Sequence, residues 1–126
     1  MKKVLLIITI LFLISCKKEE TKKEPLYSTT ETAKTPVELG QEIFEGRGNC
    51  ASCHQLNQKI IGPSIQDIAQ KYKENKGDIV AFLKGEAEPI VDPSQYEVMK
   101  TNFAITKTMS ESELKSLEAY FYSNLK

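Results

Sequence analysis

The segment Cys50-Ala51-Ser52-Cys53-His54 constrains the fold and the chemistry of this 126-residue chain more than any other feature. It holds two cysteines three positions apart, followed directly by the only histidine in the sequence. Two thiols and one imidazole within five consecutive residues are typical of a metal, cofactor or redox site. The rest of the sequence decides which of these sites is formed.

Three alternatives each lack something that they require. A zinc site needs four ligands, and beyond this segment the chain offers carboxylates but no second cysteine pair. A thioredoxin-like redox pair needs surrounding strands, and the sequence shows no strand pattern. A structural disulfide between Cys50 and Cys53 would leave the position of His54 directly after them unexplained. The spacing C-x-x-C-H is the attachment signature of c-type haem, in which both thiols bond to the porphyrin and the histidine binds the iron. We therefore predict one covalent haem c, held by Cys50, Cys53 and His54.

The N-terminus is typical of an export signal. Met1, Lys2 and Lys3 precede an eleven-residue segment at 4–14 that is apolar except for Thr9, and this is too short for the roughly 20 residues that cross a bilayer as a helix. Residues 13–16, which read LISC, resemble the lipobox of bacterial lipoproteins, in which the signal is removed and the cysteine is acylated. The resemblance implies a signal peptide over 1–15, a lipid anchor on Cys16, and placement on the periplasmic or cell-surface side of a bacterial membrane.

An exported chain is expected to have modified or bridged thiols. Three cysteines cannot pair evenly, and lipidation of Cys16 leaves Cys50 and Cys53 as a matched pair. The lipidated N-terminus and the following residues, 16–36 in all, are rich in charge, Thr and Ser, so we predict a disordered tether. The nineteen residues 17–35 of this tether span roughly 25 Å when flexible and about 60 Å when extended. Residues 37–126 form the predicted domain.

Charge indicates no special partner for the domain. The chain carries 17 basic and 17 acidic residues, and from residue 37 onward there are 10 basic and 13 acidic residues. Binding to nucleic acid needs a basic face, which this composition does not provide, so we expect none. We expect a monomer.

Capping and periodicity predict short helices and no strands. Thr35, Pro36 and Glu38 form a capping box that opens a helix ending at about Glu45, with Leu39 or Gly40, Ile43 and Phe44 on its buried side. Further helices are predicted over 64–72, over 78–84 with Gly85 ending it, and from Ser110 to about Asn124. Residues 86–109 show no sustained period and contain two prolines, which predicts a long functional loop.

These elements predict an all-α domain of three to five short helices. Such short helices bury little apolar surface by themselves, so a large apolar group is expected at the centre. One haem wrapped by the helices would supply it.

A single histidine excludes a second imidazole ligand from the same chain, so the sixth iron ligand is Met or absent. Met109 directly precedes the helix cap Ser110, and Leu114 stands where a hydrophobic staple needs its second member, which gives Met109 a structural role. Met99 lies in the predicted loop, where no periodic packing accounts for it. We therefore predict Met99 as the ligand, with Met109 or no ligand as the alternatives.

Over residues 37–126 the chain resembles class I cytochrome c, in which the haem motif lies near the start of the domain and the ligand methionine in its later half. In that family a glycine and an aromatic of the first helix pack on the last helix, and Gly40 and Phe44 against Leu117 and Tyr120 match those positions. The resemblance also implies that the carbonyl of Pro63 accepts a hydrogen bond from His54.

One departure from the family concerns the residues after the ligand methionine. Many members carry a proline there, whereas Lys100, Thr101 and Asn102 follow Met99 in this chain. Asn102 could hold this segment through a side-chain hydrogen bond instead.

The resemblance implies a one-electron carrier and not an enzyme, because a haem with both His and Met ligands has no open site for a substrate. Its partners would be membrane-associated redox proteins, a donor and an acceptor. Two alternatives stay open: a sensor or enzyme that binds gas or peroxide at an open or displaceable sixth position, and an electron-input subunit of one oxidoreductase.

Overall fold

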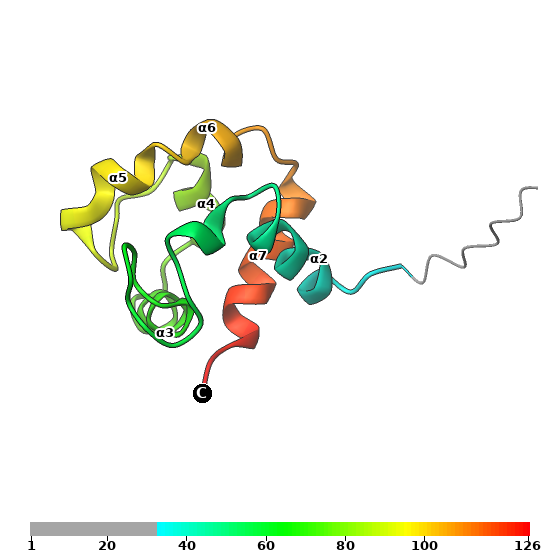
Figure 1. Ribbon diagram of the computed structural model, residues 1–126, viewed down its shortest axis with the longest axis horizontal. Coiled ribbons are helices and arrows are strands. Elements are labelled where there is room, and N and C mark those ends of the chain that lie inside the picture. The colour runs from blue at the N-terminus through cyan, green and yellow to red at the C-terminus, as the bar shows by residue number, and fades with distance from the viewer. Residues whose placement is uncertain (1–32) are drawn as a thin grey trace, which may run out of the picture. The chain divides into compact units, whose positions relative to one another are not determined.

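The computed structural model describes residues 33–126, and in this range the protein is entirely helical (Figure 1). The elements are α2 (Pro36–Glu45), the 3-10 helix η2 (Cys50–Ser52), α3 (Ile65–Asn75), α4 (Ile79–Lys84), the 3-10 helix η3 (Pro93–Gln95), α5 (Tyr96–Lys100), α6 (Phe103–Thr106) and α7 (Glu111–Ser123). No helix of this part of the chain is long and apolar enough to cross a membrane. The predicted signal peptide, Cys16 and most of the predicted tether lie outside the described residues.

The helix starts predicted from the sequence are confirmed. At α2 the Thr35 hydroxyl accepts a hydrogen bond from the backbone N–H of Glu38, and the Glu38 carboxylate accepts one from the backbone N–H of Thr35. Ser110 and Glu113 form the same reciprocal pair at α7. Such boxes satisfy two backbone donors that the first helical turn leaves without partners, which is why they fix where a helix begins.

The prediction of a structureless loop over 86–109 is wrong. Residues 93–106 form η3, α5 and α6, so the described residues contain six α-helices where three to five were predicted. These elements have three, five and four residues, too few to show a helical period in the sequence. None of them has a side-chain cap, and Pro93 occupies the first position of η3, where proline is favoured.

The all-α class is confirmed, because residues 33–126 form no strand and contain only one isolated β-bridge, between His54 and Lys59. The core centres on the contact between α2 and α7. A Cβ atom on Gly40 would lie 1.9 Å from the Ser116 carbonyl oxygen, so only glycine lets the two backbones approach this closely. The Phe44 ring lies 5.3 Å from the ring of Tyr120 and 5.8 Å from that of Phe121, as centroid distances. The predicted packing of Gly40 and Phe44 on the last helix is therefore confirmed.

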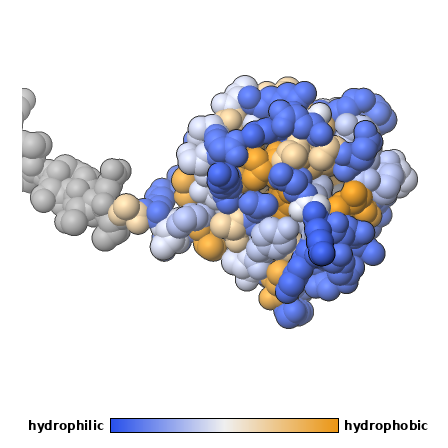
Figure 2. Space-filling model, turned by 180° about the vertical axis from the view of Figure 1, so that it is seen from behind, coloured by the Kyte–Doolittle hydropathy of each residue, from blue (hydrophilic) through white to orange (hydrophobic). Residues whose placement is uncertain are grey.

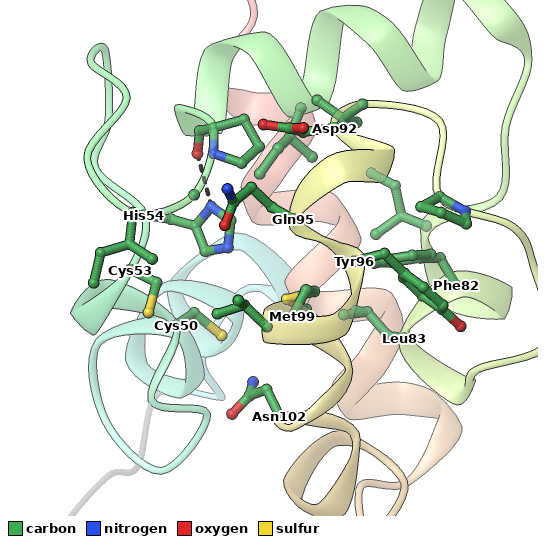
Figure 3. Close-up of a pocket in the computed structure, with 18 of the residues that line it drawn as sticks. Cys50, Cys53, His54, Phe82, Leu83, Asp92, Gln95, Tyr96, Met99 and Asn102 are labelled. Carbon is green, nitrogen blue, oxygen red and sulfur yellow. Dashed lines mark hydrogen bonds between the residues drawn. The ribbon is translucent and has the colours of Figure 1, made fainter.

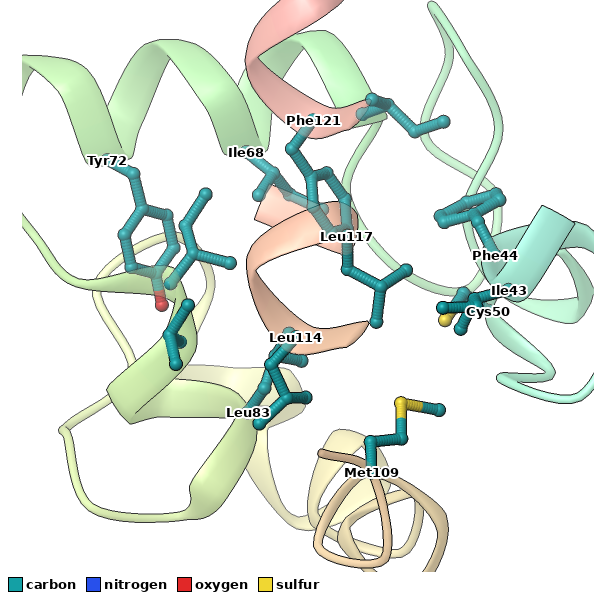
Figure 4. Packing of buried hydrophobic residues seen from close by; sticks show 13 residues of the cluster. Ile43, Phe44, Cys50, Ile68, Tyr72, Leu83, Met109, Leu114, Leu117 and Phe121 are labelled. Carbon is teal, nitrogen blue, oxygen red and sulfur yellow. The ribbon is translucent and has the colours of Figure 1, made fainter. Parts of the chain in front are cut away.

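The other helices enclose a space beside this pair. In Figure 1, α5 and α6 run along one edge of the domain and α3 lies at the opposite edge, with α4 and α7 between them. The Thr106 hydroxyl at the end of α6 donates a 2.6 Å hydrogen bond to the Leu83 carbonyl of α4, which joins these two helices. Figure 4 shows the buried hydrophobic side chains that α3, α4 and α7 contribute to the centre.

Candidate functional site

The cysteines and the histidine are presented by one tight turn. Asn49 adopts a left-handed backbone conformation with φ of 53°, which asparagine tolerates better than most residues, and η2 follows. The backbone N–H groups of Cys53 and His54 both donate to the Cys50 carbonyl, at 3.1 and 3.0 Å. Because residues i and i+3 of a 3-10 turn lie on the same side, the turn places Cys50 and Cys53 together.

The loop after the turn is fixed by the start of α3. The backbone N–H groups of Ile65 and Gln66, which have no partners inside the helix, donate to the carbonyls of Gln55 and Leu56 at 2.8 and 3.2 Å. The Gly62 N–H donates to the Cys53 carbonyl at 2.8 Å. Backbone hydrogen bonds therefore hold the chain on both sides of His54, at Cys53 before it and at Gln55 and Leu56 after it.

The His54 imidazole is buried and has a defined tautomer. Its Nδ1 atom lies 2.7 Å from the Pro63 carbonyl oxygen. A carbonyl can only accept, so Nδ1 carries the proton and the Nε2 lone pair is free to bind a metal. Burial lowers the pKa of His54, and the bond to Pro63 acts in the opposite direction with a smaller effect. The ring is therefore neutral at pH 7, which is the state that binds iron.

Gly62 is required by the approach of the backbone to this ring. A Cβ atom there would lie 2.4 Å from Cε1 and 2.8 Å from Nδ1 of His54. The Gly62-Pro63 pair thus provides both the space for the imidazole and the acceptor that orients it.

A pocket that is partly open to solvent lies next to the imidazole. Its lining is mainly apolar and comes from α3, α4, α5, α7 and the loops between them. Figure 3 shows Cys50, Cys53, His54 and Met99 around it. Asp92 is the only charged side chain among the lining residues, apart from the titratable Cys, His and Tyr groups.

The two candidate methionines occupy different environments. Met99 lines the pocket from α5, and in Figure 3 its side chain extends from that helix toward His54 and Cys50. Met109 is 7% exposed, belongs to the hydrophobic core together with Leu114, and does not line the pocket (Figure 4). The structure therefore places Met99 with the cysteines and the histidine, and Met109 apart from them.

A hydrogen bond joins the Met99 segment to the turn that carries the cysteines. The Asn102 side-chain amide donates to the Gly48 carbonyl at 3.1 Å, across 54 residues of sequence. The expectation that Asn102 holds this segment is confirmed.

Sequence reasoning missed several pocket residues on and around α5. Tyr96 lines the pocket three positions before Met99, on the same side of the helix, and its ring lies 6.3 Å from Phe82 and 6.2 Å from Phe103. The spacing of Tyr96 and Met99 is a helical signal, but it was hidden in a segment predicted to be a loop. Asp92 also lines the pocket, and no local pattern indicates it.

The chemistry of the donor set fits a covalently bound haem. Cys50 and Cys53 are free thiols, and burial raises the pKa of Cys50 to about 11. Because neither sulfur is in a disulfide, both are available to form thioethers, with one imidazole beside them and a thioether sulfur across an apolar pocket. Within residues 33–126 no three His, Cys, Asp or Glu side chains gather to hold a metal ion, so the zinc alternative finds no support there.

Comparison with known proteins agrees with this geometry. A sequence model of the family described as cytochrome c matches residues 37–124. Cytochrome c-552 of Nitrosomonas europaea is 44% identical over 39 residues, which are 31% of this chain and 37% of that protein. Cytochrome c-551 of Pseudomonas denitrificans is 39% identical over 44 residues, 35% of this chain and 51% of that protein.

A third relative is cytochrome c2 of Rubrivivax gelatinosus, which is 46% identical over 43 residues, 34% of this chain and 45% of that protein. The matches thus span about half the length of the curated relatives, or less.

Proposed function

The chain belongs to the cytochrome c family, and on that premise we propose that it is a membrane-anchored monohaem protein that carries single electrons between redox partners. The family's cofactor is one covalently attached haem c. In this chain Cys50 and Cys53 would hold it through thioethers, and His54 and Met99 would bind the iron. Pro63 would fix the orientation of His54. A haem so bound supplies a one-electron Fe(III)/Fe(II) couple.

One observation carries this proposal: the neutral His54, oriented by Pro63, shares a pocket with both thiols and with the Met99 side chain. A thioether is a poor donor to ferric iron and favours the ferrous state, so Met99 would raise the reduction potential. The mainly apolar lining would disfavour the more highly charged ferric state and so act in the same direction. If His54 and Met99 both bound the iron, no coordination position would be left for a substrate, which favours a carrier over an enzyme.

Exposed apolar side chains near the pocket suit a transient docking face. Ile61 and Val98 line the pocket and are 53% and 51% exposed, and Leu56 and Ile60 are exposed on the same loop as Ile61. Figure 2 shows, on the face that it views, hydrophobic side chains that reach the surface among hydrophilic ones. A small contact area is typical of weak, short-lived electron-transfer complexes.

The proposed anchor rests on the sequence alone, because Cys16 lies outside the described residues. A lipid on Cys16 and a flexible tether would keep the domain at a membrane while it visits a donor and an acceptor there. The partners would themselves be membrane-associated redox proteins on the exported side. If the protein were instead the electron-input subunit of one oxidoreductase, crosslinking would identify a single stable partner.

The test is an absorption spectrum of the purified protein, matured in its native host, oxidised and reduced, with and without carbon monoxide. A six-coordinate haem that stays with the denatured polypeptide and is unchanged by carbon monoxide is the expected result. The double variant Cys50→Ser with Cys53→Ser is the control and should lose the covalent haem. A colourless wild-type protein would refute the haem site, and rapid binding of carbon monoxide would favour the gas-binding alternative.

A further inference from the structure

An ion pair joins the two segments that carry the proposed iron ligands. The Lys59 Nζ atom lies 2.7 Å from an Asp92 carboxylate oxygen, across 33 residues of sequence. Lys59 lies in the loop after His54, and its backbone forms an isolated antiparallel bridge with that of His54. The lysine end of the pair is therefore tied directly to the residue that presents the imidazole.

The aspartate end is tied to Met99. Asp92 immediately precedes η3, and η3 continues without a break into α5, so residues 93–100 form one helical segment that begins directly after Asp92 and contains Met99. The Ser94 hydroxyl donates to the second Asp92 oxygen, which orients the carboxylate. The hydrogen bonds from Lys59 and then Ser94 lower the pKa of Asp92, so the carboxylate is ionised at neutral pH.

Few other contacts hold α5 in place. It has no buried residue and no side-chain cap, and the ion pair of Lys100 with Glu97 lies within the helix itself. The packing of the Tyr96 ring on Phe82 and Phe103, the packing of Met99 against the hydrophobic core and the Asn102 bond to Gly48 are other contacts that anchor it. The ion pair thus holds the N-terminal end of the segment, and Asn102 holds the C-terminal end.

We propose that the pair Lys59 and Asp92 positions the sixth ligand, by closing the Met99 segment against the loop that carries His54. This inference rests on the proposed assignment of Met99 to the iron. In this proposal an external ligand would take the place of Met99 when α5 moves away from the pocket, and that movement would separate Lys59 from Asp92. The pair therefore opposes opening, and its removal increases the fraction of open molecules.

The size of the effect follows from the exposure of the pair. The Asp92 side chain is 17% exposed and the Lys59 side chain 55%, so the pair is partly shielded from solvent. Partly exposed pairs of this kind shift an equilibrium by about two- to fivefold. Loss of either partner should raise the apparent affinity of external ligands by that factor and leave covalent attachment intact.

The experiment titrates the ferric holoprotein with imidazole and follows the far-red sulfur-to-iron band, with the reduction potential as a second readout. Lys59→Gln and Asp92→Asn should each increase imidazole affinity about two- to fivefold. The two together should give no more than one alone, because they remove the same interaction. The exchanged pair Lys59→Asp with Asp92→Lys should restore the wild-type affinity, which a merely structural role of either residue does not predict.

Lys84→Gln is the matched control, because it breaks an ion pair of Lys84 with Glu111 that joins α4 to α7, and neither residue lines the pocket. It should leave imidazole affinity unchanged. Unchanged imidazole affinity in both Lys59→Gln and Asp92→Asn would overturn the proposed role of the ion pair. An effect of Lys59→Gln alone would overturn it as well. Failure of the ligand assignment is distinguishable, because Met99→Leu would then keep the far-red band.

Discussion

The Nδ1 atom of His54 donates a 2.7 Å hydrogen bond to the carbonyl oxygen of Pro63. The acceptor belongs to the backbone, so the identity of the side chain at position 63 matters less than the position of the peptide. That position depends on Gly62, where a Cβ atom would lie 2.4 Å from the ring. The orientation of the proposed iron ligand is therefore set by a glycine.

Gly62→Ala should disturb the site more than Pro63→Ala. The added methyl group forces either the imidazole or the loop to move, at a cost of about 1 to 3 kcal/mol in the free energy of unfolding. The reduction potential of the holoprotein should shift with it. Pro63→Ala keeps the carbonyl and should change the potential little. Equal effects of the two substitutions, measured by urea unfolding and redox titration, would show that the approach of Gly62 to the ring is unimportant.

Gly40→Ala should destabilise the contact between α2 and α7. The new Cβ atom would lie 1.9 Å from the Ser116 carbonyl oxygen, which is backbone and cannot rotate away, so the helices must separate. We expect a loss of about 3 kcal/mol or more in the free energy of unfolding, measured in urea. Gln41→Ala, at the next and exposed position of α2, should change it by less than about 0.5 kcal/mol. Similar values for both variants would contradict this account.

Substitutions of Met99 and of Met109 should have different effects on the absorption spectrum and on the free energy of unfolding. Met99→Leu keeps the volume but removes the sulfur, so the far-red band of the oxidised protein should vanish and the reduction potential should fall. Met109→Leu should keep both, and Met109→Ala should cost about 2 to 5 kcal/mol in unfolding free energy because Met109 is part of the core. Loss of the band in Met109→Leu would transfer the ligand role to Met109.

The residues at which α2 and α7 begin could be predicted from the sequence, because an N-terminal capping box involves only neighbouring residues. The boxes at Thr35 and Ser110 need only residues three positions apart, and the helices begin where these boxes place them. The contact of Gly40 with α7 was reached through the resemblance to class I cytochrome c, since no local pattern pairs two helices so far apart in sequence.

The remaining features depend on tertiary contacts. The helix that carries Met99 has five residues and no cap, so neither its period nor its start is visible in the sequence. The pairing of Lys59 with Asp92 joins residues 33 positions apart, among many charged residues that could pair equally well. Only the folded chain selects that pair.

Cys16→Ser should release the protein from membranes. If acyl chains on Cys16 hold the mature protein at the bilayer, the serine variant has no thiol to modify and should appear in the soluble exported fraction. Fractionation and mass measurement of the mature N-terminus provide the test, and haem content serves as the control for correct export. Unchanged membrane association of a variant that contains haem would count against the lipid anchor.

Acid should lower the free energy of unfolding, in part because it protonates the Glu113 carboxylate. Its carboxylate accepts from the backbone N–H and the hydroxyl of Ser110 and pairs with Arg47, and these interactions hold the pKa of Glu113 below its ordinary value. The unfolded chain therefore binds a proton at higher pH than the folded one. The stabilisation is complete above about pH 5 and is lost as the pH falls through the folded pKa. Glu113→Gln should flatten this part of the stability curve in urea unfolding, and an unchanged slope would exclude Glu113 as a contributor.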